Sequence, residues 1–234
     1  MTGHTLTLMV LPTAWGLRNA SAFNLKAQAL LAASGLAHET VEALPAKGPK
    51  GKLPALVDGE RTIGDSALIQ AHLAAAHGFD PDAALDARQR AESEAYRRLA
   101  EEHLYFVNLH VRWVQRPRPT RDAFFGTLPA PVRAAVFAAL RRQVKRTLWG
   151  QGIGRHSVAE ILDFGRQDID ALAARLDGAP FFHGERPTSI DAALYPQILN
   201  TYAVPYDTPL RRHAAAIGTL VDYCARCDAA FFGP

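Results

Sequence analysis

Residues 51–73, GKLPALVDGERTIGDSALIQAHL, carry the signals that decide the fold of this chain. A tight turn and Leu53-Pro54 lead into an extended run, PALVDG, and a second run, RTIG, follows it. Asp58-Gly59, between the two runs, is a dipeptide typical of a two-residue hairpin turn. Asp65-Ser66 then stands where a helix cap is expected, ahead of apolar positions at helical spacing that end near Gly78. The stretch therefore predicts two short antiparallel strands followed by a helix.

The residues before this stretch predict a strand, a helix and a second strand. Apolar and polar residues alternate over 5–11, which is typical of a strand. From Ala22 the apolar residues recur at helical spacing until Ser34-Gly35 ends the pattern. Residues 40–43 favour a second strand. The order β-α-β followed by β-β-α predicts a small mixed sheet with helices packed on it.

The residues after this stretch are almost entirely helical in pattern. The segment GFDPDA, with its Gly, Pro and Asp residues, reads as a linker. Helical patterns follow at 83–115, 130–148, 157–177, 188–202 and 209–228. The sequence thus predicts an α/β domain over 1–78, a linker over 79–85 and an all-helical domain over 86–234.

The composition is that of an ordinary globular protein, with 48% apolar and 21% charged residues among 234. Disorder and collagen-like repeats are excluded. The net charge of +3 is too small to indicate nucleic-acid binding, so the basic segments RWVQRPRPTR and RRQVKR are interpreted as solvated faces. We read no signal peptide and no membrane span.

The two cysteines, Cys224 and Cys227, are too few for a disulfide scaffold, and a reducing cytoplasm is expected. Their CxxC spacing falls late in a helical pattern and follows no strand, which is the wrong context for a reactive pair. Packing inside the helix is the favoured interpretation, with a metal site as the alternative.

Three short segments have both a structural and a functional interpretation. Ser21 is placed as a helix N-cap, but a hydroxyl at a helix N-terminus can also stabilise a bound anion such as a thiolate. A proline such as Pro54 is common at the start of a strand, but a cis Leu53-Pro54 bond would present the Leu53 backbone to a peptide-like ligand. Asp65-Ser66 caps a helix, or binds the ammonium and carboxylate groups of a ligand.

In combination, these segments resemble a known family. The order of strand, loop, Ser at a helix start, Gly-Lys-Leu-Pro turn and acidic residue with Ser is similar to the thioredoxin-like domain of glutathione transferases. The second half adds WGQGIGRHSVAEI at 149–161 and FFHGERPTSIDAALYPQI at 181–198, in which Thr188 and Asp191 form a capping-box pattern. Within the superfamily the likeness is greatest to the failed axon connections and metaxin branch.

The resemblance implies that glutathione binds across the first domain. The Leu53 backbone, before a cis Pro54, would pair with the cysteinyl unit, with Lys52 in the same turn. Asp65 and Ser66 would hold the γ-glutamyl end, and Ser21 would face the thiol. Asn19 is the other candidate for the sulfur contact.

The helix start departs from the pattern of the branch at two positions. It reads SAFNLK, where the branch reads like Ser-Pro-Phe-Cys-Leu-Lys, so Ala22 replaces a proline and Asn24 replaces a cysteine. Without a cysteine in this loop, a glutathione-dependent thiol reductase is disfavoured.

For the pocket of the second substrate, the resemblance suggests residues of the loop and of the first long helix. These candidates are Trp15, Asn19, Phe106, His110 and Trp113.

The sequence therefore predicts a glutathione transferase fold, with transfer of the glutathione thiolate to a small apolar electrophile as its function. The resemblance further implies a homodimer. No metal is expected. The alternative is a non-catalytic glutathione-binding or assembly module of metaxin-like type, because fold alone does not determine function.

Overall fold

The computed structural model describes residues 5–233. The first domain contains β1 (Leu6–Val10), α1 (Ala22–Ser34), β2 (His38–Glu42), the short 3-10 helix η1 (Pro45–Lys47), β3 (Ala55–Asp58), β4 (Arg61–Gly64) and α2 (Ser66–His77). The second contains α3 (Ala87–Arg98), η2 (Leu99–Leu104), α4 (Tyr105–His110), η3 (Val111–Gln115), α5 (Pro117–Phe125), α6 (Ala130–Gln151), η4 (Ile153–Arg155), α7 (Val158–Leu176), α8 (Ser189–Tyr202), α9 (Pro209–Ala216) and α10 (Gly218–Phe232).

The predicted mixed sheet is confirmed, with strand order β2-β1-β3-β4. β1 pairs with β2 in parallel and with β3 in antiparallel, and β3 and β4 form the predicted hairpin. Leu6, Leu8 and Val10 alternate as buried positions of β1, because successive side chains of a strand point to opposite faces. The sheet thereby offers one apolar face to the helices.

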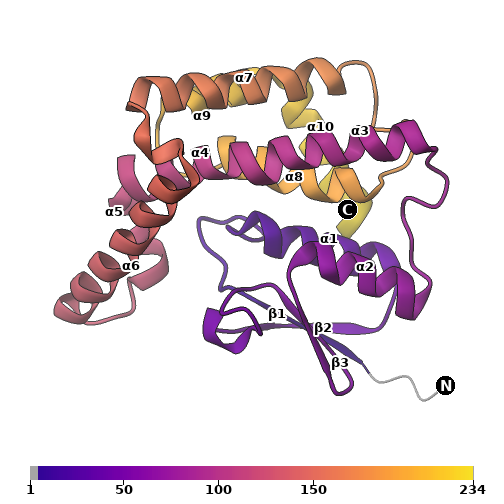
Figure 1. Ribbon diagram of the computed structural model, residues 1–234, viewed down its shortest axis with the longest axis horizontal. Coiled ribbons are helices and arrows are strands. Elements are labelled where there is room, and N and C mark those ends of the chain that lie inside the picture. Colours follow the sequence, from indigo (N-terminus) through magenta and orange to yellow (C-terminus); the bar gives the residue numbers. More distant parts are fainter. Residues whose placement is uncertain (1–4, 234) are drawn as a thin grey trace.

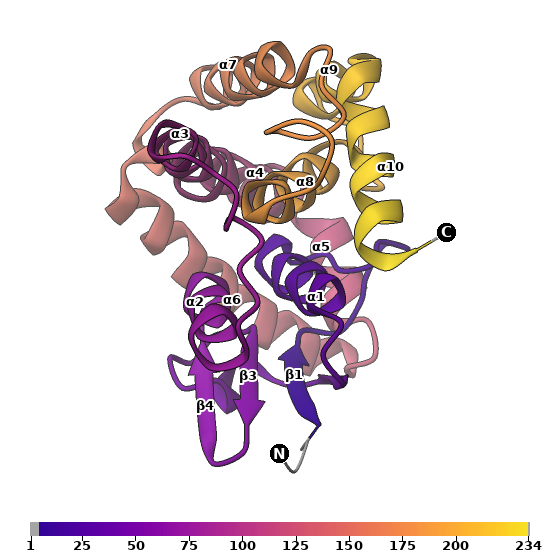
Figure 2. The ribbon, with the colours of Figure 1, turned by 90° about the vertical axis from the view of Figure 1, so that its right-hand side faces the viewer.

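Helix α1 lies between this sheet and the helical domain (Figures 1 and 2). Leu25, Leu30 and Leu31 are fully buried. The helix ends at Gly35, whose φ of 66° is the left-handed conformation that glycine adopts without steric cost. Because α1 is buried on two sides, its N-terminus is held firmly where the site is formed.

The second domain is helical throughout, as predicted. α3, η2, α4 and η3 form one continuous run in which the two η segments have π-helical hydrogen bonding. Helix α8 is buried along nearly its whole length, and its start is fixed by the expected capping box of Thr188 and Asp191. α8 lies at the centre of this domain (Figure 2), and its buried polar residues, such as Asp191 and Asn200, are hydrogen-bonded.

Two helices differ from the sequence-based expectation. Residues 117–125, between the predicted helical patterns 83–115 and 130–148, form α5. Pro117 and Pro119 are compatible with it because they fall in the first turn, where the backbone N–H has no helical partner. The predicted helix over 209–228 is two helices. Ile217 adopts extended angles between α9 and α10, and α10 continues to Phe232.

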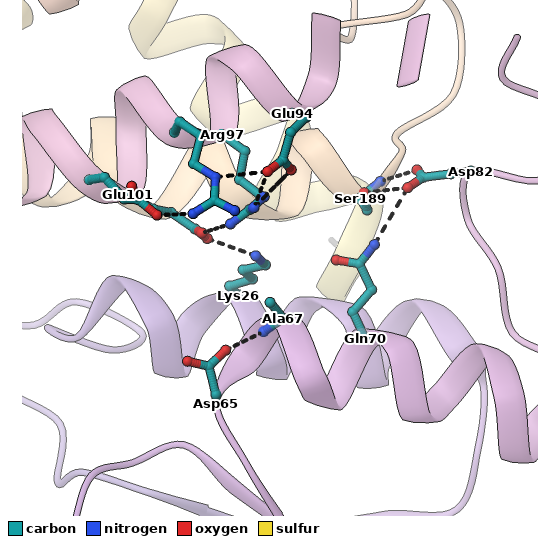
Figure 3. Close-up of polar contacts among 11 residues, drawn as sticks. Lys26, Asp65, Ala67, Gln70, Asp82, Glu94, Arg97, Glu101 and Ser189 are labelled. Carbon is teal, nitrogen blue, oxygen red and sulfur yellow. Dashed lines mark hydrogen bonds and ion pairs between the residues drawn. The ribbon is translucent and has the colours of Figure 1, made fainter. Parts of the chain in front are cut away.

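The two domains are joined by buried polar contacts. Lys26 of α1 donates to Glu101 of η2 at 2.7 Å, and the two side chains are only 1% and 7% exposed. In the connection between the domains, Asp82 accepts hydrogen bonds from the Ser189 backbone N–H at 2.9 Å and from its hydroxyl at 2.5 Å (Figure 3). Among the described residues, no helix is both long and apolar enough to cross a membrane.

Candidate functional site

Ser21 is the N-cap residue of α1, but its hydroxyl does not cap the helix. Its backbone is extended, and its side chain makes no capping hydrogen bond within the described chain. The backbone N–H of Ser21 is instead held by Asn19 Oδ1 at 2.8 Å. The partly exposed hydroxyl therefore stands at the positive end of a 13-residue helix and is available to a ligand.

Asn19 and Asn24, on either side of Ser21 in the sequence, are both completely buried. The Asn19 amide donates to the Leu11 carbonyl at 3.3 Å. In the orientation that satisfies both of its amide atoms, Asn24 accepts from the Leu11 N–H at 2.7 Å and donates to the Leu53 carbonyl at 3.2 Å. The end of β1 thus connects the Ser21 loop to the Leu53 turn.

These contacts correct one prediction from the sequence. Asn19 was expected to line the substrate pocket or to meet the sulfur. Since it is 0% exposed and both ends of its amide bind the backbone, its role in this structure is to shape the loop.

The peptide bond between Leu53 and Pro54 is cis, and it lies beside the buried Asn24 amide. The Leu53 N–H has no hydrogen-bond partner among residues 5–233, whereas the Leu53 carbonyl is in contact with the Asn24 amide. A carbonyl oxygen has a second lone pair, so it can still accept from a ligand. Lys52, in the same turn, is exposed. The turn offers backbone groups of the kind that pair with a peptide.

Asp65 and Ser66 open α2 on the other side of this turn. The Asp65 N–H donates to the Pro54 carbonyl at 3.3 Å, and the Asp65 carboxylate accepts from the Ala67 N–H at 2.9 Å (Figure 3). Asp65 is exposed, while Ser66 is only 3% exposed. The pair presents a carboxylate and a helix N-terminus at one place, which suits a ligand with ammonium and carboxylate groups.

Arg112, in η3 of the helical domain, is a residue that the sequence analysis missed. Its guanidinium donates to the Ala20 carbonyl at 2.8 Å and to Asn200 Oδ1 at 2.9 Å, and it lies over the Trp15 ring at 4.7 Å. The positive charge is therefore placed against the residue before Ser21, where it favours a bound anion. Arg112 belongs to the segment interpreted as a solvated face, and its partner Ala20 is 92 residues away, so no local signal could have found it.

The predicted pocket residues do not come together as one wall. Trp15 packs edge-on against Phe124 and Tyr206, with ring centroids 5.3 and 5.7 Å away. Trp113 stacks on Phe137 of α6 at 5.5 Å. These two aromatic residues serve mainly to pack elements of the helical domain against each other and against the loop.

Phe106 and His110 are placed differently. Phe106 packs against Tyr105, and the Tyr105 ring contacts Phe23 in the first turn of α1. His110 is 6% exposed and hydrogen-bonded to Gln115, and burial together with nearby Lys145 lowers its pKa. Its burial does not support the substrate contact expected from the sequence.

Cys224 and Cys227 are free, buried thiols of α10. Burial raises the pKa of both, which keeps them protonated and unreactive. This agrees with the packing interpretation of the CARC segment.

Comparison with protein families yields two matches along the chain. The N-terminal domain model of glutathione S-transferases matches residues 22–118, and the C-terminal domain model matches residues 165–227. The isoprene-epoxide glutathione S-transferase of Rhodococcus sp. (strain AD45) is 33% identical over 228 residues, which is 91% of this chain and 93% of that protein.

Two other relatives are not named as transferases. Failed axon connections of Drosophila melanogaster is 30% identical over 213 residues, covering 82% of this chain but 49% of that protein. Human metaxin-2 is 23% identical over 188 residues, covering 79% of this chain and 71% of that protein.

Solved structures show the same fold. A glutathione S-transferase of Ceriporiopsis subvermispora in complex with glutathione matches with a TM-score of 0.69 at 16% identity, over 99% of both chains. Glutathione S-transferase III in its apo form matches with a TM-score of 0.60 at 19% identity, over 97% of this chain and 92% of that chain.

Proposed function

The chain belongs to the glutathione S-transferase superfamily, and we propose that it transfers the thiolate of glutathione to a small apolar electrophile. The observation that carries the proposal is the Ser21 hydroxyl, which stands at the start of α1 without serving as its cap. An uncommitted hydroxyl beside helical N–H groups is suited to an anionic sulfur.

In this proposal, Ser21 donates a hydrogen bond to the sulfur of bound glutathione. A hydrogen bond to a charged group contributes about 1.5 to 3 kcal/mol, which corresponds to about a 10- to 100-fold increase in the thiol's acid dissociation constant. The guanidinium of Arg112, bound to the neighbouring Ala20 carbonyl, acts in the same direction. The site thereby increases the fraction of nucleophilic thiolate at neutral pH.

The backbone of glutathione is proposed to lie along the Leu53 turn. The Leu53 N–H would donate to the cysteinyl unit, the exposed Lys52 would face its glycyl side, and Asp65 with Ser66 would hold the γ-glutamyl end. Holding the thiolate and the electrophile together contributes further to the rate.

An epoxide is the first electrophile to test, because the relative from Rhodococcus is named for one. The thiolate sulfur would form a bond to one ring carbon while that carbon's bond to oxygen breaks, and the alkoxide would take a proton from water. The sum is addition of the thiol across the ring, and it consumes no oxidant or reductant. Phe106, whose neighbour Tyr105 contacts Phe23 in the first turn of α1, is the pocket residue that we retain in this role.

The rival is a non-catalytic module that binds glutathione or a protein, in line with the likeness to metaxin-2 and failed axon connections. The hydroxyl of Ser21 favours the enzyme, since a purely structural N-cap would use it to bind the helix backbone. We also propose that the protein forms a homodimer. A cytoplasmic location is proposed as well, in keeping with its two free thiols.

The experiment compares the wild type with Ser21→Ala in glutathione binding, in thiolate absorbance of bound glutathione and in conjugation of isoprene epoxide. We expect Ser21→Ala to lower kcat/KM by about 10- to 100-fold at neutral pH, because the thiol pKa rises. The deficit should shrink as the pH rises and the thiol ionises without help.

Ser21→Thr, which keeps a hydroxyl, is the matched control and should retain most of the thiolate signal. Glutathione binding without thiolate in the wild type would favour the non-catalytic module. An equal loss at every pH would show that Ser21 has no effect on the ionisation of the thiol.

A further inference from the structure

Two histidines and one aspartate converge at the end of the first domain that lies away from the Ser21 loop. Asp58 ends β3 at the hairpin turn, which lies at the bottom of Figure 2, and His72 and His77 belong to the C-terminal half of α2. His72 Nε2 lies 2.6 Å and His77 Nε2 lies 2.7 Å from the same oxygen, Asp58 Oδ2. Three potential ligand atoms, one from each residue, lie within 4.8 Å of one another.

The convergence of two imidazole rings on one carboxylate oxygen differs from an ordinary His–Asp pair. The two imidazole rings are inclined by 74°, with centroids 5.7 Å apart, so their Nε2 atoms point to a common place instead of stacking. Elsewhere in the described chain, His103 with Asp168 and His213 with Asp170 are pairs of one ring and one carboxylate. A second ring on the same oxygen is what distinguishes this cluster.

The donor set is one that zinc prefers. Neutral imidazole nitrogen and carboxylate oxygen bind Zn²⁺ at about 2.0 to 2.2 Å, and tetrahedral geometry then places the ligand atoms about 3.4 Å apart. Reaching that spacing requires each nitrogen to move from the carboxylate oxygen by about 0.7 Å, which side-chain rotation alone can supply. The three side chains are 10 to 21% exposed, so an ion can enter and water can complete the coordination.

We propose that Asp58, His72 and His77 form a zinc site that links the β3–β4 hairpin to the end of α2. The ion would be structural. Along α2, the ligands His72 and His77 lie about 9 and 16 Å from Ser66 at the rise of an α-helix, so the ion does not contact the groups that the proposed function assigns to glutathione. Fixing the far end of α2 steadies the helix whose first residues, Asp65 and Ser66, face the ligand.

The test uses the untagged full-length protein, stripped with a chelator, because a histidine tag binds metal itself. Calorimetric titration with zinc chloride should show one ion per chain. His72→Gln and His77→Gln should each lower the affinity by at least about 10- to 100-fold, since a lost ligand costs no less than a lost second-shell contact. Glutamine can still donate a hydrogen bond to Asp58, which protects the fold.

His213→Gln is the matched control, because it removes a ring from an ordinary His–Asp pair, and its zinc affinity should equal that of the wild type. Thermal stability should rise with zinc in the wild type and in His213→Gln, but not in the double variant His72→Gln/His77→Gln. Circular dichroism of each variant without metal verifies folding.

Cobalt(II) reports on the ligands directly. It should give the visible absorption of a site with nitrogen and oxygen ligands and no thiolate charge-transfer band, because Cys224 and Cys227 lie elsewhere, in α10. A thiolate band, binding that persists in the double variant, or the absence of stoichiometric binding would each overturn the proposal.

Discussion

Asp65 is the residue with the most unusual backbone in the site. Its φ of 91° and ψ of 130° lie in a region that residues with a side chain rarely adopt, at a cost of about 1–3 kcal/mol. Two hydrogen bonds hold it there, one from its own N–H to the Pro54 carbonyl and one from the Ala67 N–H to its carboxylate. A strained backbone at an exposed residue is the observation that motivates the proposed contact of Asp65 with the γ-glutamyl end.

Replacing Asp65 by asparagine separates its two roles. The amide oxygen of Asp65→Asn can still cap α2, so the free energy of unfolding should change by less than about 0.5 kcal/mol. Loss of the charge should weaken glutathione binding by about 10-fold or more, since a charge-assisted contact to the ammonium group is lost. Denaturant unfolding and calorimetric titration measure the two effects.

Asp65→Ala is the companion variant and should lose about 1 kcal/mol of stability as well, because the cap is gone. Unchanged glutathione affinity in Asp65→Asn would contradict the assignment of Asp65 to the γ-glutamyl end.

At the residue scale, the sequence predicted which segments meet but not how each side chain is used. Ser21, Leu53 and Asp65 were identified because caps and prolines are local signals. The burial of Asn19 and the reach of Arg112 to Ala20 depend on contacts between residues distant in sequence, such as the bond between Asn200 and Arg112. Such contacts have no local signature.

At the scale of elements, α8 depends on the carboxylate that opens it. Asp191 is fully buried and accepts four hydrogen bonds, from the Phe182 N–H, the Thr188 N–H, the Thr188 hydroxyl and the Tyr223 hydroxyl. Burial raises the pKa of Asp191, and these hydrogen bonds oppose that rise. One side chain thus fixes α8, the preceding loop and α10 together.

We expect Asp191→Ala to destabilise the protein by about 3 kcal/mol or more, because several buried donors lose their acceptor at once. Tyr223→Phe, which removes a single donor, should cost about 1 kcal/mol. Urea unfolding of both variants measures the difference, and equal losses would show that the cap is not the main role of Asp191.

The element boundaries show where sequence signals mislead. The capping boxes at Thr188 and Ser157 are strong local patterns, and both are present. α5 falls between the predicted helical patterns 83–115 and 130–148, and its Pro117 and Pro119 lie in the first turn, where proline is compatible with a helix. The break at Ile217 is a backbone change that apolar periodicity does not encode.

At the scale of the whole molecule, ion pairs between distant segments join the two domains. Lys26 and Glu101 are 75 residues apart, and Arg18 and Asp228 are 210 apart. Arg18 donates to both oxygens of Asp228 at 3.0 Å, and the Tyr195 hydroxyl donates to the same carboxylate at 2.6 Å. Composition and periodicity predict both domains but cannot pair these charges.

The Arg18–Asp228 pair predicts a dependence of stability on pH. The hydrogen bond from Arg18 lowers the pKa of Asp228 below its ordinary value of 3.8. An acid whose pKa is lower in the folded state stabilises the fold above its ordinary pKa, and this contribution disappears as the pH falls through the lowered value. Because both side chains are 40% exposed, the contribution is below about 1 kcal/mol.

Asp228→Asn should therefore be less stable than the wild type at neutral pH and approach it at an acid pH well below the ordinary value of 3.8. Denaturation midpoints at the two pH values measure this convergence. A difference that stays constant with pH would mean that the variant acts through packing instead of charge.

The burial of Asn24 limits how this scaffold could be redirected toward redox chemistry. A sulfur introduced at that position would be sealed beneath the Leu53 turn, out of reach of any disulfide. The better position is Ser21, three residues earlier. Ser21→Cys would place a thiol at the start of α1, where the helix N-terminus promotes its ionisation. An engineer seeking a reductase from this framework should begin there.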